Sequence, residues 1–134
     1  MSTKQSFLNR ELWLLTFQGA FQRAKIYTKE ASEKQRKQFR EALSEYVEQN
    51  LLQQYHGKVN DEKHIENIHA LIKFTEKFEP ILKPGKLYFG VAQKILNLYL
   101  KYQWCVGNSQ EPPHFPVYPE LCNRRNDRFE LMHL

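Results

Sequence analysis

Apolar residues recur at three- and four-residue spacings along most of this chain, and no stretch shows the strict two-residue alternation that is typical of a β-strand. Side chains three and four positions apart lie on one face of an α-helix, so this spacing predicts helices. The chain has 134 residues, of which 41% are hydrophobic, and this is enough apolar material to close one core. The sequence therefore predicts an all-α fold, a compact bundle of four main helices in a single domain that spans residues 1–134.

Cap and stop signals divide the chain into helices. The first helix is expected over residues 6–25, and the second is expected to begin after Thr28, which can cap it, and to stop at Gly57. A third helix is expected to begin after Asn60 and to end at Pro80, because a proline pushes the preceding residue out of the helical region.

The fourth helix, expected over residues 88–106, is the most apolar and should lie at the centre of the fold. Before it, Lys83-Pro84-Gly85-Lys86 has the residues of a type II turn, with proline at the second position and glycine at the third. The side chains of the third helix that are expected to face inward are Ile65, Ile68, Leu71, Ile72, Thr75 and Phe78.

The segment after the fourth helix is rich in proline. Residues 109–119 contain four prolines and cannot form a regular helix, so we expect this segment to wrap the surface in extended form. A short terminal helix is expected to begin at Pro119. No apolar run approaches the roughly 18 residues that a membrane-spanning helix needs, and the first residues lack the apolar core of a secretory signal. We therefore expect a soluble cytoplasmic protein that does not contact membranes.

Positive charge is concentrated in one part of the chain. The formal net charge is +5, and residues 23–40 hold seven basic and two acidic residues, whereas the rest of the chain is balanced. Such a segment is either a solvated helix face with intrahelical ion pairs or a contact surface for phosphates. The candidate phosphate contacts are Arg36, Lys37 and Arg40.

A polar stripe follows one side of the fourth helix. At about 100° per residue, its members fall within one arc of about 100°. These residues are Gly90, Gln93, Lys94, Asn97, Lys101 and Trp104. The simpler interpretation is that the stripe is the solvent-exposed face of an amphipathic helix. The functional interpretation is a surface for an anionic or planar ligand, since ammonium groups, carboxamides and an indole suit phosphates, carboxylates and base edges.

Part of the chain resembles a segment of poorly characterised bacterial and mobile-element proteins. The similarity covers Phe89-Gly90-Val91-Ala92-Gln93-Lys94, Asn97, Lys101-Tyr102 and Pro113-His114-Phe115-Pro116-Val117. The layout is also distantly similar to helix-hairpin-helix DNA-repair glycosylases. That resemblance implies a hairpin at Pro84-Gly85 and a place for Lys94 on the following helix. Tyr118 stands where those enzymes have a catalytic aspartate, and no glycine follows two residues after Gly85.

No other motif indicates chemistry. His64 and His69 are five residues apart and do not share a helix face, so solvated or capping histidines are expected rather than metal ligands. Cys105 and Cys122 are expected to be structural. The sequence contains no phosphate-binding or dinucleotide-binding glycine motif and no nucleophile elbow, so we expect no enzymatic activity, cofactor or metal.

Two hypotheses remain. The first is a small non-enzymatic interaction protein that binds another protein or its own copy, for example as a homodimer, because the first and fourth helices are apolar over a broad arc. The second is a nucleic-acid-binding module that uses the basic segment 23–40 together with the polar stripe of the fourth helix.

Overall fold

The computed structural model describes residues 3–107, which form four α-helices and no β-strand. Helix α1 spans Thr3–Phe21, α2 spans Glu33–Tyr46, α3 spans Asp61–Thr75 and α4 spans Phe89–Cys105. The predicted all-α bundle of four helices is therefore confirmed for this part of the chain. The proline-rich segment 109–119 and the short helix expected from Pro119 lie outside the described residues.

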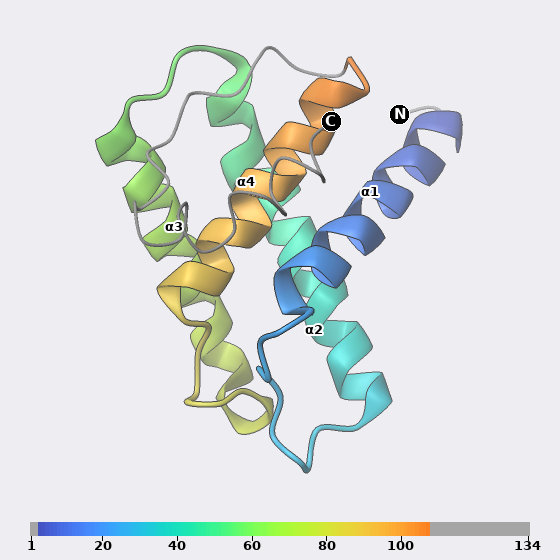
Figure 1. Cartoon of the computed structure of the whole chain (residues 1–134), viewed down its shortest axis with the longest axis vertical. Helices are drawn as coiled ribbons and strands as arrows, with labels where there is room; N and C mark the ends of the chain where they lie inside the picture. Colours follow the sequence, from blue (N-terminus) through green and yellow to red (C-terminus); the bar gives the residue numbers. More distant parts are fainter. Residues whose placement is uncertain (1–2, 108–134) are drawn as a thin grey trace.

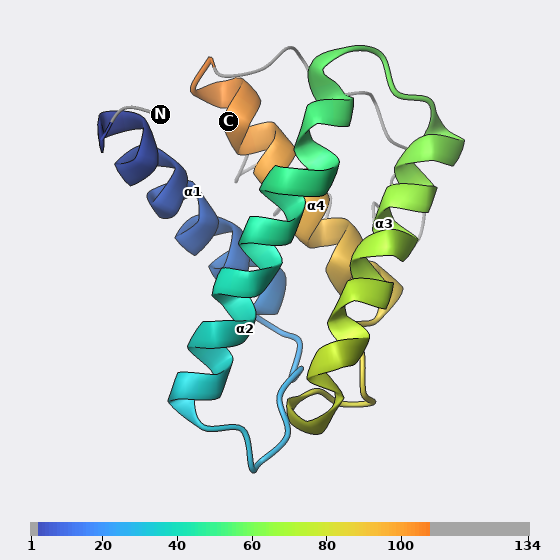
Figure 2. The same cartoon turned by 180° about the vertical axis from the view of Figure 1, so that it is seen from behind.

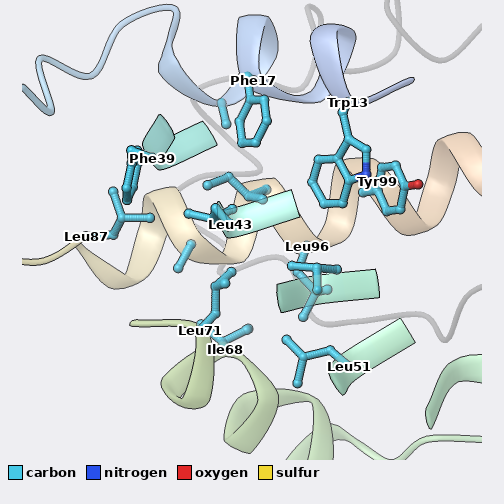
Figure 3. Packing of buried hydrophobic residues seen from close by; sticks show 14 of the residues in the cluster. Trp13, Phe17, Phe39, Leu43, Leu51, Ile68, Leu71, Leu87, Leu96 and Tyr99 are labelled. Carbon is cyan, nitrogen blue, oxygen red and sulfur yellow. The ribbon is translucent and has the colours of Figure 1, made fainter. Parts of the chain in front are cut away.

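Helix α4 crosses one face of the bundle, between α1 on one side and α3 on the other (Figure 1). Helix α2 lies on the opposite face, and it is in front of α4 when the molecule is turned by 180° (Figure 2). The core lies between these helices. Figure 3 shows Trp13 and Phe17 of α1 and Leu43 of α2 pointing into the same region as Leu96 and Tyr99 of α4. Among the described residues, no helix is long and apolar enough to span a bilayer.

The second helix begins later than predicted. Ser32, not Thr28, is its N-cap, and Ser32 forms a reciprocal capping box with Gln35. The backbone N of Thr28 instead donates to the Ile81 carbonyl at 2.9 Å, and its hydroxyl donates to the Pro80 carbonyl at 3.2 Å. Thr28 is therefore paired with a distant segment, and the helix is capped at Ser32 instead.

A π-helical turn, Val47–Leu51, and a 3-10 turn, Leu52–His56, follow α2 without a break and end at Gly57, where the stop was predicted. The buried residues Phe39, Leu43, Val47 and Leu51 are spaced by four. In a regular α-helix, each such step rotates the side chain by about 40°. The wider π turn reverses this drift between Val47 and Leu51, so Leu51 still faces the core.

Asn60 caps α3 as predicted, because its Oδ1 accepts from the backbone N of Lys63 at 2.8 Å. The prediction that Ile65 faces inward is wrong, since it is 38% exposed. The polar side chains of His64 and Asn67 are buried in the inner face of α3 instead. Both residues contact the Tyr55 hydroxyl, and these hydrogen bonds stabilise them in the interior.

The turn before α4 differs from the predicted type II turn. Gly85 N donates to the Leu82 carbonyl at 2.8 Å, so the turn covers residues 82–85 and places Pro84 at its third position. The Lys83-Pro84 peptide bond is cis, which is the geometry of a type VI turn. Gly85 has a φ of 101°, as the prediction of a left-handed glycine required.

Candidate interaction surface

Helix α1 carries apolar side chains on both its inner and its outer side. Its inner side is packed into the core and includes Trp13 and Phe17, which are buried. On the outer side, Phe7 is 60% exposed, Leu14 is 50% exposed and Leu15 is 48% exposed. The hydrophobic core therefore covers only part of the apolar surface of α1, in line with the broad apolar arc of its sequence.

We define the outer stripe of α1 as six residues that fall within an arc of about 140° at 100° per residue. They are Phe7, Arg10, Glu11, Leu14, Leu15 and Gln18. Arg10, Glu11 and Gln18 are exposed like the three apolar members. The stripe thus combines large apolar side chains with one cation and one anion at its middle.

A shallow groove flanks this stripe on each side. The groove between α1 and α4 has a volume of about 550 Å³ and is lined by residues that include Leu15, Gln18 and Tyr102. The groove between α1 and α2 has a volume of about 530 Å³ and is lined by residues that include Arg10 and Leu14. Helix α1 is therefore a ridge between two grooves, which is a shape that another helix can pack against.

A polar network fixes the inner side of α1. Trp13 Nε1 donates to Glu48 Oε1 at 2.9 Å, and the Tyr99 hydroxyl donates to the same oxygen at 2.7 Å. Gln103 Nε2 donates to the Tyr99 oxygen at 2.8 Å and to Asn9 Oδ1 at 3.1 Å. Burial and the Glu48 carboxylate both raise the pKa of Tyr99, so this side chain remains a neutral donor.

Ring stacking adds to this network. The rings of Trp13 and Tyr99 are stacked with centroids 3.7 Å apart. Glu48 lies in the π-helical turn that follows α2, so the contacts of its carboxylate join three parts of the bundle. The outer stripe is therefore presented by a helix that is held in place from behind.

The three candidate phosphate contacts of α2 have different surroundings. The Arg36 guanidinium lies 4.8 Å from the centroid of the Tyr27 ring, and Arg36 Nε donates to the Ala31 carbonyl at 3.2 Å. Arg40 forms an ion pair with Glu33 at 3.3 Å. Burial raises the pKa of the Tyr27 hydroxyl, and the nearby Arg40 opposes this rise. Arg36 and Arg40 therefore support the local structure, whereas Lys37 is exposed beside the groove between α1 and α2.

The polar stripe of α4 follows the outward side of that helix only in part. Lys94, Asn97 and Lys101 are half-buried, and Trp104 is exposed. Gln93, which was also predicted to belong to a ligand-facing surface, is buried at the edge of the stripe. Burial lowers the pKa of Lys101. Helices α2 and α4 themselves lie on opposite faces of the bundle (Figures 1 and 2).

Asn97 contributes to a hydrogen-bonded chain rather than to an open surface. Its Oδ1 lies 2.7 Å from His64 Nε2, and the His64 Nδ1 lies 2.6 Å from the Tyr55 hydroxyl. Asn67 Nδ2 donates to the Tyr55 oxygen at 2.9 Å. An amide oxygen can only accept, so Nε2 carries the proton and Nδ1 accepts from Tyr55. The chain therefore holds a neutral imidazole, and burial lowers the pKa of His64 to about 4.

Two further predictions are corrected here. His64 is buried and hydrogen-bonded, not solvated, because it lies on the same face of α3 as Ile68, Leu71 and Thr75. Cys105 was expected to be structural within the apolar run, but it is exposed at the end of α4. Cys122 lies outside the described residues. Within residues 3–107, no group of three or more His, Cys, Asp or Glu side chains could hold a metal ion.

Some members of these networks had no signal in the sequence. Glu48 belongs to a run of carboxylates with ordinary solvated spacing, and its contact with Tyr99 depends on how α4 packs beside this part of the chain. For His64 a signal existed, because positions 64, 68, 71 and 75 follow one helical face. Comparison of the chain with known protein families, with curated proteins and with solved structures finds no significant match.

Proposed function

We propose that this protein is a small non-enzymatic interaction protein that associates with its own copy through the outer stripe of α1. The observation that carries the proposal is the exposure of Phe7, Leu14 and Leu15 on one face of one helix. Single exposed apolar residues are ordinary on protein surfaces, but three large ones on the same stripe are typical of an interaction site.

The shape and rigidity of this surface support the proposal. The ridge of α1 lies between two grooves, and helices associate by fitting ridges of side chains into such grooves. Trp13 and the network around Glu48 hold α1 from the inside, so little conformational freedom has to be lost when a partner binds. Helix α1 has 19 residues, which limits the length of the interface to about 28 Å. An interface made by one such helix from each copy buries a small area, so we expect a weak dimer.

The first test is the mass of the protein in solution. We expect the mass from light scattering to rise from the 16.1 kDa of one chain toward twice that value as the concentration increases. A concentration range from about 1 μM to about 1 mM covers association free energies of about 8 to 4 kcal/mol. The double variant Leu14→Lys/Leu15→Lys should remain a monomer over the same range, because two buried ammonium groups per copy would lose their hydration in the interface.

The matched control is the double variant Ile65→Lys/Tyr88→Lys, which alters two exposed apolar residues away from α1. This control should associate like the unaltered chain. A chain that stays monomeric at every concentration would contradict the proposal, and so would equal association of both double variants.

Binding of nucleic acid is the second candidate function. The observation in its favour is the exposure of Lys29, Lys34 and Lys37, which lie on the segment that leads into α2 and on its first turns. These lysines, together with Arg23 and Lys25, give one end of the molecule a local positive charge. Arg36 and Arg40 are less suitable as test positions, because their replacement would also remove the contacts to Tyr27 and Glu33.

The test is a titration of duplex DNA at several salt concentrations, followed by fluorescence anisotropy. If the proposal is right, the variant Lys29→Glu/Lys34→Glu/Lys37→Glu should weaken binding and lower the salt slope by about 0.9 for each phosphate contact that is lost. The matched control, Lys58→Glu/Lys73→Glu/Lys86→Glu, makes the same change of net charge at other exposed positions. An equal effect of both variants would show that only the overall charge matters and would argue against a site on this segment.

A further inference from the structure

We propose that residues 108–120 of this chain fold back along the outward side of α4 and cover its polar stripe, with Glu111 beside Lys101 and Phe115 against Gly90. The contact lies on α4, so it is independent of the outer stripe of α1 and of self-association.

The two surfaces carry opposite charge. Helix α4 contains two lysines, Lys94 and Lys101, and no acidic residue. Residues 108–120 contain Glu111 and Glu120 and no lysine or arginine. Lys101 is half-buried, and a carboxylate beside a half-buried ammonium group favours its charged form. Charge complementarity of this kind favours docking and sets the register of the docked segment.

The end of α4 changes the direction of the chain. Gly107 has a φ of 80°, in the left-handed region, and its backbone N donates to the Trp104 carbonyl at 3.0 Å. The backbone N of Val106 donates to the Tyr102 carbonyl at 3.1 Å. A left-handed glycine after the last helical residues is a common way to end a helix. Helix α4 therefore ends in a turn from which the following segment can return along the helix.

The lengths of the two surfaces match. A helix advances by about 1.5 Å per residue, so Lys101 lies about 9 Å and Gly90 about 26 Å from Gly107 along α4. A proline-rich segment in extended form advances by about 3.1 Å per residue, which allows Glu111 to lie about 12 Å and Phe115 about 25 Å from Gly107. Glu111 can therefore reach Lys101, and Phe115 can reach the first turn of α4.

The stripe has a shape that suits such a segment. Gly90 is exposed, and a Cβ added at this position would have no neighbour within 4 Å, so a ring can lie against the backbone there. Phe89 is half-buried next to Gly90, and Trp104 is 40% exposed at the other end of the stripe. Residues 113–119 contain two overlapping P-x-x-P motifs. Extended segments with this motif bind to surfaces that are lined by aromatic side chains.

The covalent connection favours a segment of the same chain over a separate molecule. Glu111 is four residues after Gly107, and a short tether gives an effective concentration in the millimolar range. Weak contacts such as one ion pair and one ring suffice at that concentration. In the docked arrangement, the carboxylate of Glu111 takes the position beside Lys101 for which an anionic ligand was predicted.

NMR spectroscopy of the isotopically labelled full-length protein tests the docking directly. We expect nuclear Overhauser contacts between the ring of Phe115 and the α-protons of Gly90. The variant Phe115→Ala should shift the amide signals of Gly90 and Lys101 toward those of the undocked state. The variant Glu111→Lys should lower the equilibrium constant of docking by about two- to tenfold, because it replaces an ion pair with two like charges.

Two further variants test the register of the segment. The double variant Lys101→Glu/Glu111→Lys exchanges the two charges and should restore the Gly90 signal of the unaltered chain. The matched control Glu130→Lys makes the same change of net charge as Glu111→Lys, but it lies beyond residues 108–120 and should leave the Gly90 signal unchanged. Circular dichroism verifies that each variant is folded. If the double variant does not fold, the comparison of Glu111→Lys with Glu130→Lys still decides.

Three results would overturn the proposal. The first is the absence of contacts between Phe115 and Gly90, and the second is an equal response of the Gly90 signal to Glu111→Lys and Glu130→Lys. The third is a set of contacts that arises only between labelled and unlabelled chains in a mixed sample, which would assign the segment to a second copy. The proposed self-association is tested separately, because a chain that is monomeric by light scattering can still dock its own segment.

Discussion

Acidification from neutral pH to about pH 4 is expected to lower the free energy of unfolding by about 3 kcal/mol through His64 alone. The unfolded chain binds a proton at this histidine below pH 6.5, whereas the folded protein does so only below about 4. Between these values the unfolded state holds more protons, so stability falls as the pH falls through this window. Well above pH 6.5 the histidine is neutral in both states and contributes no pH dependence.

Urea unfolding at a series of pH values measures this effect. The variant His64→Gln should be less stable at neutral pH, because it disturbs the chain from Tyr55 to Asn97, but it should lose much less stability on acidification. The control His69→Gln alters an exposed histidine on the same helix and should keep the pH dependence of the unaltered chain. An equally steep acid loss in His64→Gln would refute the role of this buried imidazole.

Replacement of Tyr99 is expected to have the largest effect of any single substitution considered in this protein. Tyr99→Ala should lower the free energy of unfolding by about 4 kcal/mol, because it removes a fully buried ring that stacks on Trp13 and leaves a cavity. Tyr99→Phe keeps the ring and removes only the hydroxyl between Glu48 and Gln103. This variant should lose about 1 to 3 kcal/mol, the cost of leaving polar groups without a partner.

Denaturant unfolding followed by tryptophan fluorescence distinguishes the two contributions. The exposed Tyr88 provides the control, since Tyr88→Ala should change stability by no more than about 0.5 kcal/mol. If Tyr99→Phe is as stable as the unaltered chain, the hydrogen bonds to Glu48 do not hold α1 in place. If it is as unstable as Tyr99→Ala, the hydroxyl rather than the ring dominates.

The hydrogen bonds of Tyr99 also affect the proposed interaction surface on α1. Tyr99 and Glu48 fix the inner side of α1, while the outer stripe with Leu14 is exposed. Tyr99→Phe should therefore weaken self-association as well as stability, since a less firmly held helix has to be ordered when a partner binds.

The sequence by itself determined the all-α class, the four helices and several of their ends. These features depend on local chemistry, such as the side-chain cap at Asn60 and the glycine stop at Gly57, which act within a few residues. The start of α2 could not be predicted in this way. Thr28 has the chemistry of a cap, but its backbone N bonds to Ile81, which is distant in sequence.

Only the tertiary structure decided which polar residues are buried and which apolar residues are exposed. Helix α1 is apolar on both sides, so its pattern could not show that Trp13 is covered while Leu14 is exposed. Glu48 accepts from both Trp13 and Tyr99 because α1 and α4 pack beside it, and His64 is buried because Tyr55 and Asn97 satisfy both of its nitrogens. The periodicity of a sequence identifies helices, but the burial of a helix face depends on the neighbouring elements that cover it.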